Sequence, residues 1–304
     1  MTLSNRKILR TLLCLLAGTL YAVCLSACDA KEPLSENRDA EIESPVIAND
    51  LSNQKVTAIA EDTQGHIWIG TFRGLNKNNV HDYHQYFCTD DSLGLPDNQI
   101  THLLRDSKNR FWVGTVNGVC LYTDKDNFRI IPIEADNKNV RQILEDRNGR
   151  IFLNTGFQLY AYHPREEKIT CVLPEISPGN AFYAQCHIAP DNNLWVMTST
   201  GLRCYDPSTL QLKESVALSG YPYYSYLHNN ELWITGNHTL SIFDTRTRSF
   251  KPLPQPIARN TTLCNADIDY IHPYGNNGLL LNTARHGMFY YNPGTGCLLY
   301  TSDA

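Results

Sequence analysis

Several features that would assign a function directly are missing from this sequence. It has no lysine- and arginine-rich run after the first ten residues, and 31 acidic side chains outnumber 26 basic ones, which argues against nucleic-acid binding. It also has no phosphate-binding loop, dinucleotide fingerprint or G-x-S-x-G nucleophile motif. The composition, 42% hydrophobic and 19% charged, is that of a globular protein. We therefore expect a folded chain with no catalytic residue and no cofactor.

Cysteine is plentiful, but it is poorly placed for metal binding or for a disulfide scaffold. Three of the ten cysteines lie in the N-terminal apolar segment, and the other seven form no C-x-x-C pair. These seven are predicted to be mainly buried, small hydrophobic residues: Cys88, Cys120, Cys171, Cys186, Cys204, Cys264 and Cys297. His81 and His84 are expected on opposite faces of a strand, so no metal site is predicted there.

The beginning of the chain has the pattern of an export signal. Arg6, Lys7 and Arg10 precede an apolar stretch over residues 11–27. Its ending, Leu-Ser-Ala-Cys, resembles a bacterial lipobox, which implies that Cys28 carries a lipid; a plain signal peptide or an uncleaved anchor is the alternative. No later apolar stretch reaches the roughly 18–20 residues needed to span a bilayer. We expect an exported, membrane-anchored protein, either periplasmic or on the outer surface.

The rest of the chain divides into a tether and a repeat region. Residues 29–49 hold six acidic side chains, two basic ones and two prolines with almost no apolar periodicity, which predicts a solvated tether over residues 29–50, after the signal over residues 1–28. Residues 51–304 are predicted to form the globular part.

A repeated motif is the most informative feature of the globular part. The clearest copies read EDTQGHIWIGT at 61–71 and RDSKNRFWVGT at 105–115. Six copies align on one central residue: Trp68, Trp112, Phe152, Trp195, Trp233 and Leu280. The steps between these residues run from 38 to 47 and average about 42.

Each repeat divides into four short strands, expected in the first copy at 56–60, 67–71, 75–77 and 83–87. Four strands in a period near 42 residues are typical of a β-propeller blade. We predict an all-β propeller with six visible blades, an incomplete seven-bladed propeller being the alternative, and we expect the tryptophans to be buried between blades. The blades are expected to start near residues 56, 100, 140, 182, 223 and 266.

The repeat resembles the two-component regulator propeller repeat, which has an acidic pair, a glycine turn, apolar-Trp-apolar-Gly-Thr and then Gly-Leu. Residues 61–75 match nearly residue for residue, and the second copy departs only at Arg105 and Val119. The resemblance spans roughly 51–300 and implies the extracytoplasmic sensor of a hybrid two-component histidine kinase, of the kind that Bacteroidetes use to detect glycans. Such sensors continue into further domains and a kinase, so we expect either a fragment of a longer sensor or a stand-alone lipoprotein.

A non-catalytic, ligand-sensing propeller is therefore the leading hypothesis for the function. Because propellers also host enzymes, a polysaccharide-processing enzyme is an alternative, and a surface lipoprotein that holds other proteins together is another. The acidic pairs at 61–62 and 145–146 precede a glycine turn, which favours turn capping over general acid–base catalysis.

The candidate ligand site lies in the loops that meet at one end of the channel. We expect polar contacts from Arg73, Asn117, His238 and Arg285 and stacking on Tyr223 or Tyr224. Because two of these are arginines, an acidic oligosaccharide is the favoured ligand. The other expected partners are further sensor domains or a second copy of the chain, and the membrane through its lipid or signal segment, but no nucleic acid.

Overall fold

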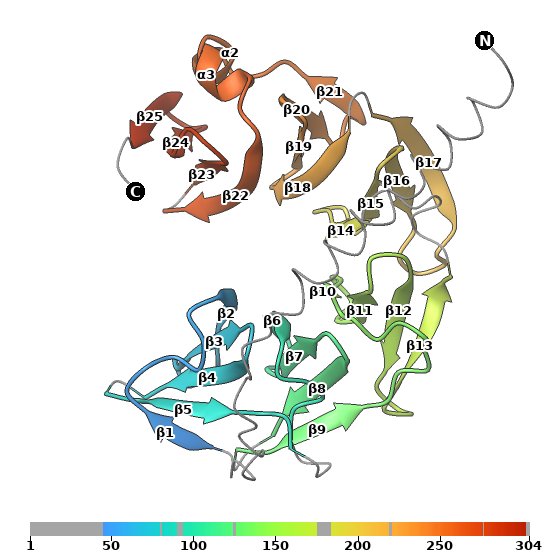
Figure 1. Ribbon diagram of the computed structural model, residues 1–304. Coiled ribbons are helices and arrows are strands. Elements are labelled where there is room, and N and C mark those ends of the chain that lie inside the picture. The colour runs from blue at the N-terminus through green and yellow to red at the C-terminus, as the bar shows by residue number, and fades with distance from the viewer. Residues whose placement is uncertain are drawn as a thin grey trace, which may run out of the picture. The chain divides into compact units, whose positions relative to one another are not determined.

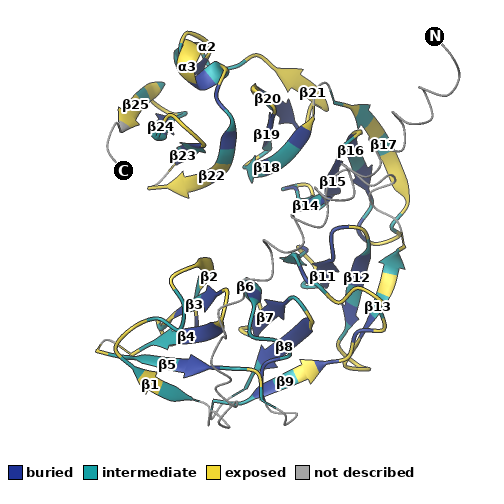
Figure 2. Ribbon diagram, viewed as in Figure 1, coloured by how far each residue is buried: buried dark blue, intermediate teal, exposed yellow. Residues whose placement is uncertain are grey.

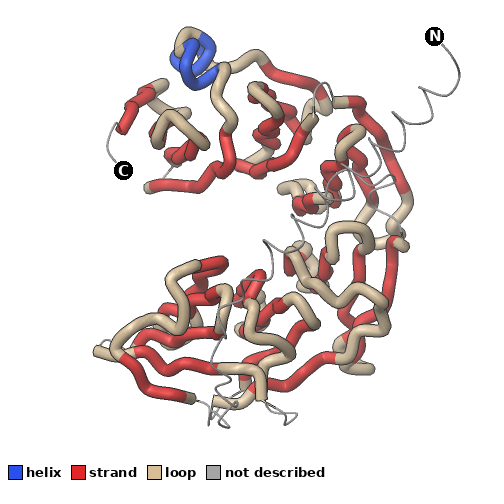
Figure 3. The backbone as a smooth tube through the Cα atoms, in the orientation of Figure 1, coloured by secondary structure: helices blue, strands red, loops and turns tan. Residues whose placement is uncertain are grey.

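The computed structural model describes residues 45–79, 81–89, 94–123, 126–174, 184–218, 221–275 and 277–301. The expected signal, Cys28 and residues 29–44 of the expected tether lie outside these ranges, so those expectations stay predictions. Regular structure in the described chain is nearly all strand (Figure 3). No helix within it has the length and apolar character needed to cross a membrane.

Six antiparallel sheets follow one another along the chain, each built from four consecutive strands, and we number them sheets 1 to 6. Sheet 1 contains β2 (Val56–Glu61), β3 (Ile67–Thr71), β4 (Gly74–Asn78) and β5 (Tyr83–Tyr86). Sheet 2 contains β6 (Ile100–Arg105), β7 (Phe111–Thr115), β8 (Gly118–Tyr122) and β9 (Phe128–Ile131). Sheet 3 contains β10 (Gln142–Glu145), β11 (Ile151–Asn154), β12 (Leu159–His163) and β13 (Lys168–Leu173).

The second half of the chain repeats this arrangement. Sheet 4 contains β14 (Gln185–Ile188), β15 (Leu194–Thr198), β16 (Gly201–Tyr205) and β17 (Leu212–Ala217). Sheet 5 contains β18 (Pro222–His228), β19 (Glu231–Gly236), β20 (Thr239–Asp244) and β21 (Ser249–Lys251). Sheet 6 contains β22 (Ile268–Tyr274), β23 (Gly278–Thr283), β24 (Met288–Asn292) and β25 (Cys297–Thr301). Two short helices, α2 (Gln255–Ala258) and α3 (Thr261–Cys264), connect sheets 5 and 6.

The sheets are the blades of a six-bladed β-propeller, which confirms the predicted fold class. The first strands of consecutive sheets lie beside one another around a common centre (Figure 1). In the same view the ring of blades is open between sheet 6 and sheet 1. Sheet 1 has an additional edge strand, β1 (Val46–Ala48), which pairs with β5. The end of the segment expected to be a tether is therefore part of the first blade.

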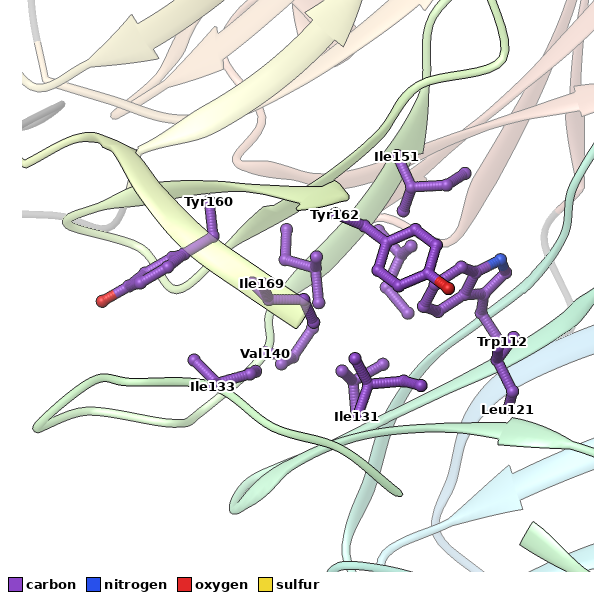
Figure 4. Packing of buried hydrophobic residues seen from close by; sticks show 12 residues of the cluster. Trp112, Leu121, Ile131, Ile133, Val140, Ile151, Tyr160, Tyr162 and Ile169 are labelled. Carbon is purple, nitrogen blue, oxygen red and sulfur yellow. The ribbon is translucent and has the colours of Figure 1, made fainter. Parts of the chain in front are cut away.

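A hydrophobic cluster fills each junction between consecutive sheets, and these clusters form the core (Figure 2). The four tryptophans of the repeat are fully buried in them, as predicted. At the junction of sheets 2 and 3, the ring of Trp112 meets Tyr162 edge to face with a centroid distance of 4.9 Å, and Ile151 packs beside them (Figure 4). The central tryptophan of a blade therefore packs against the next blade.

The glycine that follows the tryptophan motif is explained by close packing between blades. A Cβ atom on Gly70 would lie 2.5 Å from a methyl group of Ile100, the first residue of the next inner strand. Real Cβ atoms do not approach carbon so closely, so a side chain at this position would push sheets 1 and 2 apart.

The second residue of each of the two acidic pairs, Asp62 or Asp146, caps the first turn of its blade, as predicted. The Asp62 carboxylate accepts hydrogen bonds from the backbone N–H groups of Gln64 and His66, at 2.8 and 3.0 Å, and from Trp68 Nε1 at 2.9 Å. Although burial alone would raise the pKa of Asp62, these hydrogen bonds lower it overall. The carboxylate therefore fixes both the turn and the orientation of the buried indole.

Polar side chains also connect the inner strand of one sheet to that of the next. Gln185 Oε1 accepts from the Ser225 backbone N–H at 2.6 Å, and His187 Nε2 lies 2.8 Å from Ser225 Oγ. In sheet 5 the Tyr224 hydroxyl donates to the Ile271 carbonyl at 3.3 Å. We call these contacts inter-sheet links, because each one reaches the equivalent position of the following inner strand.

These links predict a loss of stability on mild acidification. Burial lowers the pKa of His187, and likewise that of His102, from 6.5 to about 4. The unfolded chain therefore takes up protons between about pH 6.5 and 4 while the folded chain does not, so stability falls as the pH falls through this window. We expect the melting temperature to drop less between pH 7 and 5 in His187→Gln than in the parent. Equal slopes would contradict this assignment.

The cysteines are only partly the buried residues that we predicted. Cys120, Cys186 and Cys204 are buried in the clusters, but Cys88, Cys171 and Cys297 are exposed. The prediction was wrong for these three because they lie on or next to outer strands, where one sheet face meets solvent.

Candidate ligand-binding face

A threonine shapes the turn between the second and third strands of each of the first two blades. Thr71 Oγ1 donates to the Gly74 carbonyl at 2.8 Å and accepts from the Arg73 backbone N–H at 3.1 Å. Thr115 makes the equivalent contacts with Gly118 and Asn117, at 3.0 and 3.2 Å. Gly74 adopts φ +111°, which favours glycine, so the turn can close within two residues. At the two turn tips, Phe72, Arg73 and Asn117 are exposed and Val116 is half-buried.

The segments that lead into the inner strands lie against these turns. The Phe72 backbone N–H donates to the Lys55 carbonyl at 2.9 Å within sheet 1. The Gly74 N–H donates to the Asn98 carbonyl at 2.7 Å, in the segment that enters sheet 2. The bond from Phe72 to Lys55 has an equivalent in sheet 6, where the Ala284 backbone N–H donates to the Asp267 carbonyl at 2.9 Å. We call the surface formed by the turn tips and the lead-in segments at this end of the blades the turn face.

The four predicted polar contacts all lie on the turn face. Arg73, Asn117 and Arg285 are exposed at turn tips of sheets 1, 2 and 6. His238 is the tip residue of sheet 5, at φ 51°, and its backbone N–H donates to Asp267 Oδ1 at 3.0 Å. Its ring Nδ1 lies 2.9 Å from the Asn265 carbonyl, so the imidazole is already oriented by the lead-in segment of sheet 6.

The two predicted stacking residues are located differently. Tyr224 lies at the junction of sheets 5 and 6, where its ring meets Tyr270 at 5.3 Å and its hydroxyl forms an inter-sheet link. Burial raises the pKa of its hydroxyl to about 12. Tyr223 sits at an irregularity in the pairing of β18 with β19, and burial, followed by the charges of Asp267 and Asp269, raises its pKa. Both rings are thus only partly accessible, and we assign Tyr224 to packing.

Other aromatic rings are better placed for stacking, and the sequence prediction omitted them. Phe72 and Phe157 lie at the turn tips of sheets 1 and 3, and Tyr221 lies in the lead-in segment of sheet 5; all three are exposed. Lys55 Nζ lies 4.5 Å from the centre of the Phe72 ring, which places a cation next to this aromatic face. Their signal in the sequence was an aromatic residue at a turn position, where propensity favours glycine and polar residues.

The opening in the ring affects how the arginines can cooperate. Arg73 and Arg285 belong to sheets 1 and 6, which lie on either side of the opening (Figure 1). The two arginines could contact the same ligand only if that ligand reached across the opening. Arg73, Phe72 and Asn117, in contrast, lie on adjacent blades. The turn face of sheets 1 and 2 is therefore the part of the candidate site where several predicted and exposed contact residues lie on neighbouring blades.

Two cavities lie away from these residues. One, of about 490 Å³, lies beside sheets 4 and 5 and is lined mainly by Leu218, Leu240 and Phe250. The other, of about 450 Å³, lies beside sheets 1 and 2 at the opposite end from the turn face, where Lys77 approaches Tyr122. In the part of the chain that the structure describes, no group of three or more His, Cys, Asp or Glu residues could hold a metal ion. His81 precedes β5 rather than lying on it.

Solved structures with the same fold include the extracellular domain of a hybrid two component system and an enzyme. The chain resembles the extracellular domain of the hybrid two component system BT3049 from B. thetaiotaomicron, with a TM-score of 0.67 and 19% identity; the match covers 86% of this chain and 37% of that one. The chain therefore spans little more than a third of that relative. It also resembles virginiamycin B lyase from Staphylococcus aureus, with a TM-score of 0.63 and 16% identity over 85% of this chain and 88% of that one. At these identities the likeness concerns the fold.

The sequence itself carries a more specific signal. No curated protein was found to match the chain in sequence. The family profile described as two component regulator propeller matches residues 50–73 and 94–117, which cover the tryptophan motif and turn tip of sheets 1 and 2. Together with the six blades, these matches confirm the resemblance seen in the sequence: the chain is a β-propeller that carries two-component regulator propeller repeats.

Proposed function

We infer that the chain is an exported, non-catalytic sensor propeller that binds an oligosaccharide on its turn face. The observation that carries this proposal is the turn face itself: exposed arginine, amide and imidazole groups stand beside exposed aromatic rings on a rigid set of turns. Fork-shaped guanidinium groups suit carboxylate or sulfate groups, and aromatic rings suit sugar faces. The regulator-propeller repeats and the likeness to an extracellular sensor domain support a sensor role and export.

The preferred ligand is an acidic oligosaccharide, because both arginines of the turn face are exposed and form no side-chain ion pair among the described residues. A hydrogen bond to a charged group contributes about 1.5–3 kcal/mol, so the loss of the Arg73 contact alone should be measurable. Export would bring the face into contact with glycans outside the cytoplasm, and the lipid-bearing Cys28 expected from the sequence would keep it at the membrane.

The test is a binding screen with the full chain. We expect one class of uronic-acid or sulfated oligosaccharide to raise the melting temperature, and Arg73→Ala to weaken its binding at least about tenfold by calorimetry. The control is Arg147→Ala, which removes one exposed arginine from a turn at the opposite end of the blades and should leave binding unchanged.

Two further results would count against the proposal. If no neutral or acidic glycan shifts the melting temperature of protein shown to be folded, binding by this chain is contradicted. Mass spectrometry of the glycan after incubation separates sensing from catalysis: an unchanged ligand supports a sensor, whereas cleavage would indicate an enzyme.

A further inference from the structure

The cavity of about 450 Å³ beside sheets 1 and 2 is formed by segments of both blades, at the end opposite the turn face. Its wall includes Lys77 on β4 and residues of the turns that connect β2 to β3, β6 to β7 and β8 to β9. None of the predicted ligand contacts of the turn face lines it. Its volume falls within the range of small-molecule sites, roughly 300–1,000 Å³. A ligand in this cavity would therefore bind independently of the turn face.

Lys77 occupies a position that is apolar in the following blades. It pairs across the strands with the central Trp68, and the residues that pair with the central residues of sheets 2 to 5 are Leu121, Ala161, Cys204 and Ile242. Lys77 is half-buried there. A charged group that is partly removed from water is unfavourable unless it has a partner of opposite charge. Packing alone thus does not account for a lysine at this position.

The junction of sheets 2 and 3 also has a cation over its aromatic rings, and that cation has a carboxylate partner. The Arg110 guanidinium lies 5.1 Å from the centre of the Trp112 ring and 5.3 Å from that of Tyr162. Arg110 Nε donates to Asp106 Oδ2 at 2.6 Å. Cation, rings and anion at this junction therefore all come from the chain itself.

At the junction of sheets 1 and 2 the cation is present without that partner. Lys77 Nζ lies 5.3 Å from the centre of the Trp68 ring and 5.5 Å from that of Tyr122, much as Arg110 lies over its two rings. Among the described residues it forms no ion pair, and its hydrogen bond is to the Tyr122 hydroxyl at 3.5 Å. An anion in the adjoining cavity would supply the missing partner.

The two carboxylates in the cavity wall are engaged by other donors. Asp126 Oδ1 accepts from the Tyr86 hydroxyl at 2.6 Å and from the Tyr122 hydroxyl at 2.9 Å. Burial alone would raise the pKa of Asp126, but these hydrogen bonds lower it overall, so it stays ionised. The Asp62 carboxylate is held by its own turn and by the indole of Trp68. Neither carboxylate forms an ion pair with Lys77.

A second cation, Arg105, lines the same cavity. Its Nη1 donates to the Asp62 carbonyl at 2.9 Å, which positions the guanidinium beside the turn between β2 and β3. Arg105 forms no ion pair within the described part of the chain, and most of its five N–H donors remain available to a ligand. Its equivalent in sheet 3 is Glu145, which bonds to Ser107 of the preceding blade. The pair of cations is therefore particular to the junction of sheets 1 and 2.

We propose that this cavity is a second ligand site, which binds a small hydroxylated carboxylic acid of about monosaccharide size. The carboxylate is held by Lys77 and Arg105, and the amide groups of Gln64 and Asn109 bind the hydroxyls. The half-buried ring of Tyr122 contacts the carbon skeleton. The proposal shares no residue with the turn face, so it does not rest on the oligosaccharide proposed above.

The charges of the wall favour a carboxylate over a phosphate. Lys77 and Arg105 supply two positive charges, but Asp62 and Asp126 lie in the same wall and offset them. A singly charged carboxylate that touches both cations gains their attraction with little repulsion, whereas a phosphate brings up to two negative charges close to the two aspartates. The ligand is thus recognised through direct contacts rather than through a general positive potential.

The first test measures binding to the full chain. Glucuronate, gluconate, glucose and inorganic phosphate are compared by calorimetry at constant ionic strength. We expect at least one of the two carboxylates to bind, and glucose and phosphate to bind at least about tenfold more weakly. If neither carboxylate binds to folded protein, or if glucose or phosphate binds as tightly, the proposal is overturned.

The second test changes the cavity. Lys77→Leu gives sheet 1 the residue that sheet 2 has at the equivalent Leu121, so we expect a folded chain whose melting temperature is not reduced and whose carboxylate binding is at least about tenfold weaker. Arg105→Gln should weaken binding as well, and it provides a second variant should the first fail to fold. The control is Lys108→Leu, the same substitution at an exposed lysine in the turn between β6 and β7 that does not line the cavity. Equal binding by Lys77→Leu and Lys108→Leu overturns the proposal.

A third measurement locates the ligand and separates this site from the turn face. The indole N–H of Trp68 donates to Asp62 in the cavity wall at 2.9 Å, so its nuclear magnetic resonance signal should shift when the carboxylate binds, while that of Trp112 stays in place. Arg73→Ala should leave this binding unchanged, even if it abolishes oligosaccharide binding at the turn face. A carboxylate that binds without moving the Trp68 signal, or that is lost in Arg73→Ala, occupies another site and contradicts the assignment.

Discussion

Replacing Trp112 with alanine is expected to reduce the free energy of unfolding by about 3–5 kcal/mol, the usual range for a buried tryptophan or phenylalanine. Trp112 is fully buried at the junction of sheets 2 and 3, where its ring contacts Tyr162 and aliphatic residues of both sheets (Figure 4). The cavity cannot be filled by collapse, because the backbones on both sides belong to hydrogen-bonded sheets. The substitution would also remove the donor that Asp106 binds.

The contribution of the buried ring and that of the indole hydrogen bond can be separated by making the same substitution at Trp112 and at Trp195. Trp112 Nε1 donates to Asp106 Oδ2 at 2.9 Å, whereas the buried Trp195 Nε1 has no hydrogen-bond partner among the described residues. Trp112→Phe loses a buried hydrogen bond and Trp195→Phe does not, so we expect the first to cost about 1–3 kcal/mol more. Urea unfolding of both variants measures the difference. Equal costs would mean that the indole bond to Asp106 contributes nothing to stability.

Much of the fold could be predicted from sequence because its determinants are local and repeated. The apolar-Trp-apolar-Gly-Thr motif sets the second strand: the tryptophan packs on the next blade, the glycine admits its inner strand, and the threonine closes the turn. The strands expected in the first blade agree with β2 to β5 within one residue at nearly every boundary. A single motif thus specifies one strand, one turn and one packing contact, and repetition specifies the rest.

Other features depend on contacts between distant segments, which local patterns do not encode. Val46–Ala48 has no repeat to align with, yet it pairs with β5 and so belongs to the first blade rather than to the tether. Cys120 is buried and Cys171 is exposed, because only some strand positions face a neighbouring blade. The local sequence around the two cysteines does not show this difference.

The candidate ligand site also has one part that local sequence patterns predict and one part that they do not. The turn tips could be predicted, since four of the residues singled out are exposed on the turn face. Local patterns do not decide which tyrosine of residues 221–226 faces outward, because β18 pairs with β19 through an irregularity between Pro222 and Tyr224. Tyr221, which precedes β18, is exposed, whereas the Tyr224 ring lies against Tyr270.

The second large effect is expected at Asp106. Its buried carboxylate accepts from the backbone N–H groups of Lys108 and Arg110, at 3.0 and 2.8 Å, from Arg110 Nε at 2.6 Å and from Trp112 Nε1 at 2.9 Å. Asp106→Ala leaves these donors without their acceptor, and the arginine loses its partner. We expect a loss of about 2–4 kcal/mol, above that of a single turn cap and near that of a broken buried ion pair.

Asp206 provides the matched control for this prediction. It caps its own turn through the Ser208 and Thr209 backbone N–H groups, at 2.8 and 3.1 Å, and pairs with Lys213, but its side chain is 30% exposed and holds no indole. Because water can replace these contacts, Asp206→Ala should lower the free energy of unfolding much less than Asp106→Ala does. Urea unfolding compares the two variants, and nuclear magnetic resonance should show the indole N–H signal of Trp112 shifted in Asp106→Ala alone. If both variants lose the same stability and the Trp112 signal stays in place, the carboxylate is only a turn cap and does not anchor the core between sheets 2 and 3.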